Sequence, residues 1–294
     1  MALHRILIIG FSMMVLFLIP ELCAQEGSIL SLRHVLTLEG VEREYFVHRP
    51  QANDSNRRTW LVVVVHGGGG TGRSFWLLDG IQAAMKDLGL NAIVVSPSFS
   101  NTDFQASRFP ALGEGAFLKL VIDELRSEFR LHKKVLLTGY SRGGQFTHRF
   151  AFQNPKLVKA CATFSAGTWT TPDGRLLIES MEPVNDPEAF LSINSNAALV
   201  PERLRSIFEP RVARVAGMRP KPGARKIPFL VMCGTLDPRL NISREFVARL
   251  EDNGFKVQNN WPDTPHPRSA EYSDQFLEYS MGAVQFFLEV ISKR

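Results

Sequence analysis

Three residues in this 294-residue sequence carry side chains that could act together in a nucleophilic reaction, and they occur in the order Ser141, Asp237 and His266. A serine hydroxyl is a weak nucleophile near neutral pH. It becomes effective when a base lies within hydrogen-bond reach and a third group orients that base. Ser141 is the central residue of a G-x-S-x-G pattern, GYSRG, at positions 139–143. These residue types in this order indicate acyl transfer through a serine nucleophile.

The segment around the serine predicts a strand, a tight turn and a helix. Residues 135–138 (VLLT) form a short apolar run that suits a strand buried on both faces. Residues 145–154 have a helical pattern, and Pro155 ends it. Gly139 and Gly143 leave room for a strained turn and for close strand–helix packing. In this context the serine hydroxyl would be exposed at the end of the strand.

Two stretches could donate hydrogen bonds to an oxyanion. The first is the backbone N–H of Arg142, which would lie at the start of the helix. The second is the glycine run HGGGG that follows the apolar strand predicted at residues 60–65. Within it, Gly68 is the first choice as donor and Gly69 the second. A flexible turn is the alternative for this run, and His66 is expected to hold the loop rather than act as the base.

Asp237 and His266 both follow predicted strands. Asp237 lies just after the strand at residues 228–233, at the end where open α/β sheets place their sites. His266 lies in the loop after the next strand, residues 255–261. We therefore expect His266 to be the base and Asp237 to orient it.

Three other residues compete less well for these roles. Asp263 shares the loop of His266 and could be a turn residue. His148 lies on the helix after the serine, and its side chain is expected to point along that helix and away from the turn. His132 precedes the strand of the nucleophile, at the opposite edge of the sheet.

Strands alternate with helices along most of the chain, which predicts a mostly parallel, doubly wound α/β sheet flanked by helices. We expect residues 25–294 to form one such domain. A hairpin is predicted at 29–50, strands at 60–65, 92–96, 135–138, 159–164, 228–233 and 255–261, and helices at 79–88, 113–129, 145–154, 241–253 and 272–290.

Residues 168–227 do not follow this alternation. The stretch is rich in turn formers, its second half is basic, and it is too long for a plain connection. We interpret it as an insertion outside the core. A cap over the site and a solvated excursion remain equal alternatives.

Residues 1–24 are predicted to be a cleaved signal peptide. A short basic start precedes an apolar run at residues 6–19, and Ala24 is an acceptable cleavage site. As a helix, the run would span about 21 Å, less than a bilayer core of roughly 30 Å. The segment therefore predicts a secreted or periplasmic protein with no stable membrane insertion after cleavage.

The charge, the cysteine content and the motifs of the chain limit which partners and cofactors we expect. The formal net charge is +5 and the pI about 9.2, but the basic residues are scattered and no nucleic-acid motif accompanies them, so no nucleic-acid partner is expected. Cys161 and Cys233 fall in predicted core strands, where two buried thiols are favoured over a disulfide. No zinc-spaced Cys/His cluster and no phosphate loop with a lysine is found, so neither a metal nor an organic cofactor is predicted.

From residue 60 to the C-terminus, the motifs HGGGG, GYSRGG, CGTLDP and TPHP resemble those of the α/β-hydrolases. The chain resembles the secreted esterase branch that contains polyhydroxybutyrate depolymerases, feruloyl esterases and related carboxylesterases. The resemblance implies Ser141 as nucleophile, His266 as base, Asp237 as orienting group, and the N–H groups of Gly68 and Arg142 as the oxyanion hole. It also implies a serine carboxylesterase that acts on a small-molecule or polymeric ester.

Two positions depart from that branch. Many of its members have cysteine after the His-Gly pair, where this chain has Gly68, and a smaller or neutral residue where this chain has Arg142. Arg142 and the basic insertion suggest substrates that carry a carboxylate or an anionic sugar. A serine peptidase, an acyltransferase and a non-catalytic polymer-binding protein remain the alternatives.

Overall fold

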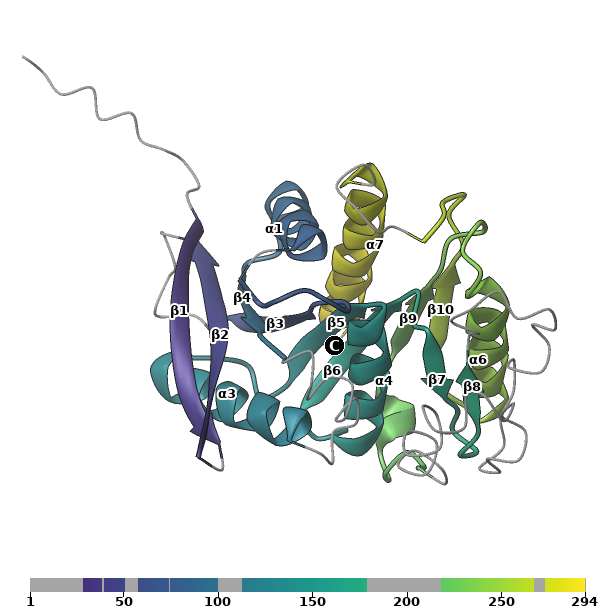
Figure 1. Cartoon of the computed structure of the whole chain (residues 1–294), viewed down its shortest axis with the longest axis horizontal. Helices are drawn as coiled ribbons and strands as arrows, with labels where there is room; N and C mark the ends of the chain where they lie inside the picture. Colours follow the sequence, from purple (N-terminus) through teal and green to yellow (C-terminus); the bar gives the residue numbers. More distant parts are fainter. Residues whose placement is uncertain are drawn as a thin grey trace, which may run out of the picture.

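The computed structural model describes residues 29–38, 40–50, 58–73, 75–99, 113–178, 218–266 and 273–293 (Figure 1). Its centre is an eight-stranded sheet of order β1-β2-β4-β3-β5-β6-β9-β10. β2 is antiparallel to both β1 and β4, and every other pairing in this sheet is parallel. The strands are β1 (Ile29–Leu38), β2 (Val41–Pro50), β3 (Trp60–Val65), β4 (Ala92–Pro97), β5 (Val135–Tyr140), β6 (Val158–Phe164), β9 (Phe229–Met232) and β10 (Val257–Asn260).

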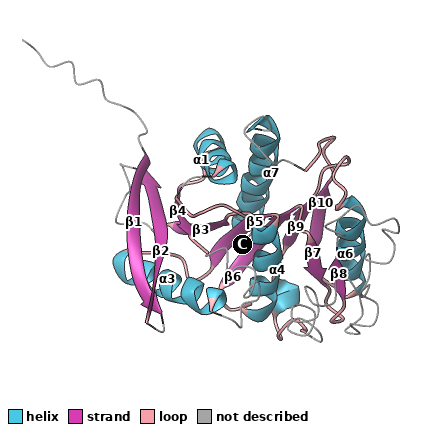
Figure 2. Cartoon of the chain, viewed as in Figure 1, coloured by secondary structure: helices cyan, strands magenta, loops and turns pink. Residues whose placement is uncertain are grey.

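Helices cover both faces of the sheet (Figure 2). On one face, α1 (Trp76–Leu88) packs against α7 (Ser273–Ser292). On the other lie α3 (Glu114–Glu128), α4 (Arg142–Gln153) and α6 (Leu240–Asp252). The predicted doubly wound α/β architecture is therefore confirmed.

The apolar strands build two cores because successive side chains point to opposite faces of the sheet. In β3, Val63 and Val65 join the cluster under α3, α4 and α6. Val62 and Val64 join the cluster under α1 and α7. All four side chains are fully buried, which explains why the strand reads as a continuous apolar run.

The predicted hairpin at residues 29–50 forms β1 and β2. Its register pairs Leu38 with Val41 across the turn and Ile29 with Pro50 at the open end. Gly40 has φ 78°, a conformation that glycine adopts without steric penalty.

Two helices begin ahead of their helical sequence patterns. α1 begins at Trp76 rather than at residue 79, and its N-cap, Phe75, makes no side-chain capping hydrogen bond. α4 begins at Arg142, where the start of the helix was expected for the oxyanion donor, and ahead of the helical pattern at residue 145, because its first turn contains two glycines. Phe75 is not a usual N-cap residue, and Ser141, the N-cap of α4, makes no side-chain capping hydrogen bond, so tertiary packing sets both boundaries.

The interpretation of residues 168–227 as lying outside the core is wrong at both ends of that stretch. Its first part is a two-stranded sheet of β7 (Thr168–Thr170) and β8 (Leu176–Ile178). The Trp169 side chain is fully buried and stacks on Phe246, with ring centroids 4.3 Å apart. Its last part holds the short helix η3 (Ala224–Lys226), and Ala224 and Ile227 are buried.

Several predictions from the sequence fall on residues that the structure does not describe. These are the signal peptide at 1–24 and the central part of the insertion, at 179–217. The cap and the cleaved leader therefore stay predictions. Within the described ranges, no helix combines the length and the apolar character needed to cross a bilayer. Cys161 and Cys233 are buried free thiols, as predicted.

Candidate active site

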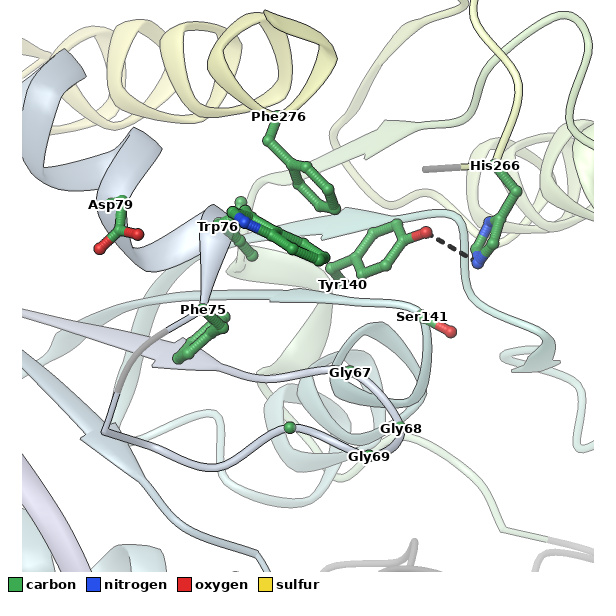
Figure 3. Close-up of a pocket in the computed structure, with 12 residues that line it drawn as sticks. Gly67, Gly68, Gly69, Phe75, Trp76, Asp79, Tyr140, Ser141, His266 and Phe276 are labelled. Carbon is green, nitrogen blue, oxygen red and sulfur yellow. Dashed lines mark hydrogen bonds between the residues drawn. The ribbon is translucent and has the colours of Figure 1, made fainter. Parts of the chain in front are cut away.

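The residues singled out from the sequence gather at the carboxyl ends of neighbouring parallel strands. Ser141 directly follows β5, Asp237 follows β9, and His266 follows β10. Ser141 and His266 line the same cleft, which has a volume of about 620 Å³ and is also lined by Gly67–Gly70 (Figure 3). This is the edge at which open α/β sheets bind their ligands.

Ser141 has a backbone conformation that non-glycine residues rarely adopt, with φ 54° and ψ −113°. Hydrogen bonds on both sides fix it there. The Ser141 N–H donates to the Phe164 carbonyl over 2.9 Å, and the Gln145 N–H donates to the Ser141 carbonyl over 3.0 Å. The turn thus places the serine side chain between the end of a buried strand and the start of a helix, as the motif predicts.

Two glycines make this turn possible. A Cβ atom at Gly143 would lie 2.2 Å from the Val65 carbonyl oxygen, and one at Gly139 would lie 2.7 Å from the Gly143 carbonyl carbon. Both separations are far below van der Waals contact. The role predicted for these glycines, close packing of the turn against strand and helix, is therefore confirmed.

The glycine run forms a turn that packs directly against the serine turn. The Gly70 N–H approaches the Gly67 carbonyl oxygen at 3.4 Å, and Gly69 has φ 81°. A Cβ atom at Gly67 would lie 3.7 Å from Ser141 Cβ, and one at Gly68 would lie 3.0 Å from Arg142 Nε. The two stretches predicted to supply oxyanion donors are therefore neighbours in the structure.

His66 holds the glycine turn in place through hydrogen bonds, as predicted. Its ring is buried, and Nδ1 donates to the Gly67 carbonyl oxygen over 2.7 Å. The Phe99 N–H donates to Nε2 over 3.0 Å. Burial lowers the pKa of His66, although both hydrogen bonds oppose the shift, so the ring stays neutral and structural.

Asp237 and His266, 29 residues apart in sequence, form a hydrogen bond of 2.7 Å between Oδ2 and Nδ1. Burial alone would raise the pKa of Asp237. The hydrogen bond and charge of His266, together with the Arg239 N–H, outweigh burial and bring that pKa below its usual value. Asp237 is therefore an ionised acceptor that fixes the orientation of the imidazole.

The loops that carry these two residues are tied to each other. The Leu236 N–H donates to the Thr264 carbonyl oxygen over 3.1 Å, and the Thr235 N–H donates to the Pro262 carbonyl oxygen over 2.8 Å. A Cβ atom at Gly234 would lie 1.8 Å from the Thr264 carbonyl oxygen. The approach of the two loops thus depends on glycine at this position.

Tyr140 holds the remaining nitrogen of the imidazole. Because Asp237 accepts the hydrogen of Nδ1, the Nε2 atom of His266 is the acceptor, and the Tyr140 hydroxyl donates to it over 2.7 Å (Figure 3). Within the described residues Ser141 is not hydrogen-bonded to His266. The structure therefore shows a resting arrangement in which Tyr140 takes the place that the serine hydroxyl would need.

Sequence reasoning missed Tyr140 and a second neighbour of the imidazole, Arg239. The Arg239 Nη1 atom lies 2.6 Å from His266 Nδ1 and also contacts Nε2. Both residues flank motif positions, Tyr140 before the serine and Arg239 two positions after Asp237. Their positions next to the motif residues were the only sequence feature that could have pointed to a role in the site.

Aromatic side chains form the wall of the cleft on the side of Tyr140 that faces away from His266. The ring of Phe276 lies 5.1 Å from that of Tyr140 and 5.8 Å from that of Trp76, and Phe75 also lines the cleft. Asp79 lies on the far side of Trp76 from Ser141 in Figure 3. The sequence analysis placed residues 75 and 76 outside any helix and so did not assign them to this wall.

The competing residues serve other purposes. Asp263 accepts a hydrogen bond of 2.5 Å from the Thr235 hydroxyl, and His132 stacks on Trp60. His148 is fully buried, and the Thr170 N–H donates to its Nε2 over 3.0 Å. The expected direction, away from the serine turn, is wrong: Nδ1 donates to the Gly144 carbonyl oxygen over 2.8 Å, one helical turn nearer to Ser141, and the missed β7 strand covers the other nitrogen.

No protein-family model matches the chain, and no curated protein matches it in sequence. Solved structures do resemble it. A ferulic acid esterase has 17% identity and a TM-score of 0.63 over 88% of this chain and 99% of its own. An S-formylglutathione hydrolase from Staphylococcus aureus has 16% identity and a TM-score of 0.58 over 88% and 96%. A poly(aspartic acid) hydrolase from Sphingomonas has 17% identity and a TM-score of 0.54 over 90% and 98%.

These neighbours are esterases and serine hydrolases of the α/β-hydrolase fold. At such identities the likeness shows the fold alone. The fold predicted from the sequence, that of the α/β-hydrolases, is therefore confirmed.

Proposed function

We propose that this protein is a serine hydrolase of carboxylic esters. One observation carries the proposal: His266, which is hydrogen-bonded to the buried Asp237, lines the same cleft as a serine on a strained strand-to-helix turn. The esterase names of the structural neighbours support the same reaction.

In the proposed mechanism, Ser141 Oγ attacks the ester carbonyl carbon while His266 Nε2 takes the hydroxyl proton. The tetrahedral intermediate then breaks its bond to the alcohol oxygen, which receives the proton from Nε2. Water attacks the acyl-Ser141 ester in the same way, and the acid leaves as the serine regains its proton. Asp237 keeps Nδ1 as the donor throughout, so that Nε2 can accept and return the proton.

The N–H groups of Gly68 and Arg142 are the proposed donors to the oxyanion. The contact between the glycine turn and the serine turn supports this assignment, because it brings the two backbones next to each other beside Ser141. Backbone donors that are fixed before the reaction need no reorganisation when the charge develops.

Before the first step, His266 Nε2 must exchange the Tyr140 hydroxyl for that of Ser141. The exchange costs about one hydrogen bond, of order 1 kcal/mol, which is small beside the barrier that acyl transfer must lower. Substrate carbonyls bound at the glycine turn would favour the exchange, since they orient the serine hydroxyl.

Labelling with a fluorophosphonate probe tests the proposal, together with hydrolysis of nitrophenyl esters of increasing acyl length. We expect wild type to be labelled and active, Ser141→Ala to lose both properties, and the exposed-site control Ser127→Ala to keep both. An unlabelled, inactive but folded wild type would contradict the proposal.

Peptide substrates and acceptor alcohols added to the same assay separate the alternatives. Faster cleavage of peptides than of esters would move the assignment to a serine peptidase. Transfer to the alcohol in preference to water would move it to an acyltransferase. Absence of labelling with retained binding to an ester polymer would favour a polymer-binding protein.

We also propose that the protein is exported and loses residues 1–24, on the basis of the leader pattern described above. N-terminal sequencing of the protein recovered from the medium or periplasm of a bacterial host tests this. Recovery of an intact N-terminus in the cytoplasm would contradict it.

A further inference from the structure

The side chain of Arg142 runs across the glycine turn at the edge of the cleft. A Cβ atom built on Gly68 would lie 3.0 Å from both Cδ and Nε of Arg142 and 3.2 Å from its Cζ. Gly68 and Ser141 both line the cleft. The guanidinium therefore lies against the glycine turn that borders the cleft, next to the serine turn, and is only partly exposed to solvent.

This guanidinium is partly buried, and within the described ranges no carboxylate is paired with it. Burial lowers the pKa of Arg142, which shows that its surroundings oppose the charge. A cation held in such a place is normally offset by an anion that accepts its hydrogen bonds. A ligand carboxylate would meet that need.

Among the described residues, the other charged side chains around the cleft do not supply this anion. Asp237 is already bonded to His266 and to the Arg239 N–H. Asp79 is exposed and lies at the far end of the cleft. The guanidinium of Arg239 adds a second positive charge beside the imidazole. The end of the cleft that holds the serine is therefore the positive end.

We infer that Arg142 binds a carboxylate of the substrate, so that the enzyme prefers esters bearing a carboxylate near the scissile bond over neutral esters of the same shape. A planar guanidinium presents parallel N–H donors that match the two oxygens of one carboxylate. The inference rests on the proposed function and names its substrate class.

Two pairs of esters test the inference, one for each side of the scissile bond. On the alcohol side, 3-acetoxybenzoate is compared with 3-acetoxybenzamide. On the acyl side, adipic acid monophenyl ester is compared with its terminal amide. Within each pair the two esters have nearly the same shape and differ in charge. The measurement is the ratio of kcat/KM for the anionic ester to kcat/KM for its neutral partner.

We expect wild type to favour the anionic ester in at least one pair. In that pair Arg142→Gln should lower the ratio by about 10- to 100-fold, the usual effect of a hydrogen bond to a charged group, mainly through KM. Arg142→Lys should keep an intermediate ratio, because it retains the charge and loses the paired donors. The backbone N–H proposed for the oxyanion is present in all three proteins.

Arg225→Gln is the matched control, since it removes one exposed cation far from the cleft. It should leave the ratio at the wild-type value, and an equal fall in this control would overturn a specific role for Arg142. Equal ratios in wild type and both Arg142 variants, with neutral esters still hydrolysed, would overturn the inference and leave the esterase proposal standing. Absence of any hydrolysis and of Ser141-dependent labelling would overturn both.

Discussion

The hydroxyl of Tyr140 occupies the acceptor nitrogen that the proposed mechanism assigns to Ser141. Removing this hydroxyl takes away one of the two donors at Nε2, the other being Arg239 Nη1, and so makes Nε2 more available to the serine. We therefore expect Tyr140→Phe to increase the rate of fluorophosphonate labelling by about two- to tenfold, the equivalent of one neutral hydrogen bond.

Tyr279→Phe provides the control for this change. Tyr279 is also a buried tyrosine, and its hydroxyl contacts Thr264 rather than the imidazole. Its loss should leave the labelling rate near the wild-type value. Slower labelling of Tyr140→Phe would mean that the tyrosine supports the active arrangement instead of competing with it.

Asp237 sets the tautomer of His266 through a single hydrogen bond. Asp237→Asn keeps the shape of the side chain but can offer its amide N–H to Nδ1, which turns Nε2 into a donor. We expect ester hydrolysis to fall by about three to four orders of magnitude while the melting temperature changes little. A loss below tenfold, measured as kcat on a nitrophenyl ester, would contradict the assigned role.

At the level of residues, the sequence was most informative where one residue type alone satisfies the geometry. Gly139 and Gly143 could be assigned from the motif because no Cβ atom fits there. The pairing of Asp237 with His266 followed from their order after successive strands. Tyr140 and Arg239 could not be assigned, because their contacts depend on how two distant loops approach each other.

At the level of elements, the hairpin of β7 and β8 is the main departure from the sequence prediction. Its turn formers indicated an excursion, yet its first strand covers α4 and α6 through Trp169. Short strands rich in threonine between turn signals carry little periodicity, so burial cannot be inferred from them. The start of α1 at Trp76 was missed for a related reason, since its N-cap, Phe75, is not a usual capping residue.

The burial of Trp169 gives a direct test of this correction. Trp169→Ala should reduce the free energy of unfolding by about 3–5 kcal/mol, as expected for removing a fully buried large aromatic side chain. Trp76→Ala is the comparison. Because the Trp76 side chain is 40% exposed, its removal should reduce the free energy of unfolding much less. Urea denaturation of the two variants measures the difference, and equal losses would place the hairpin outside the core.

At the level of the whole molecule, buried histidines make stability depend on pH. Burial lowers the pKa of His48 to about 4 and lowers the pKa values of His66 and His148. The unfolded chain takes up these protons near pH 6.5, whereas the folded chain does not. The unfolded state therefore binds more protons below pH 6.5, and stability must fall as the pH decreases from there towards 4.

His48, whose folded-state pKa is about 4, contributes a slope of about 1.4 kcal/mol per pH unit over most of that window. His66 and His148 change the stability in the same direction. Urea denaturation between pH 7.5 and 4.5 should show the decrease. His48→Gln keeps a donor for the Ser96 hydroxyl. It should reduce the slope of stability against pH by the contribution of one proton, about 1.4 kcal/mol per pH unit. Asp237 affects stability at lower pH than the histidines do. Its folded-state pKa is depressed, so its stabilising contribution is lost only as the pH falls through that value. A flat profile from 7.5 to 4.5 would contradict this account.

The architecture of the molecule was predictable because the alternation of apolar strands and amphipathic helices is a property of the chain itself. Both cores follow from period-two burial in strands such as β3. The neighbours of the site were less predictable, since their positions depend on long-range packing that no local pattern records.

The candidate site is assembled from the ends of three strands that are far apart along the chain, and β6 separates β5 from β9 in the sheet. The strand ends cannot come together until β6 is in place and the loops that carry Asp237 and His266 have formed their hydrogen bonds to each other. Catalytic competence should therefore be among the last properties to appear during refolding, after most helical structure has returned. An active fraction measured during refolding would then count fully folded molecules, which circular dichroism alone does not do.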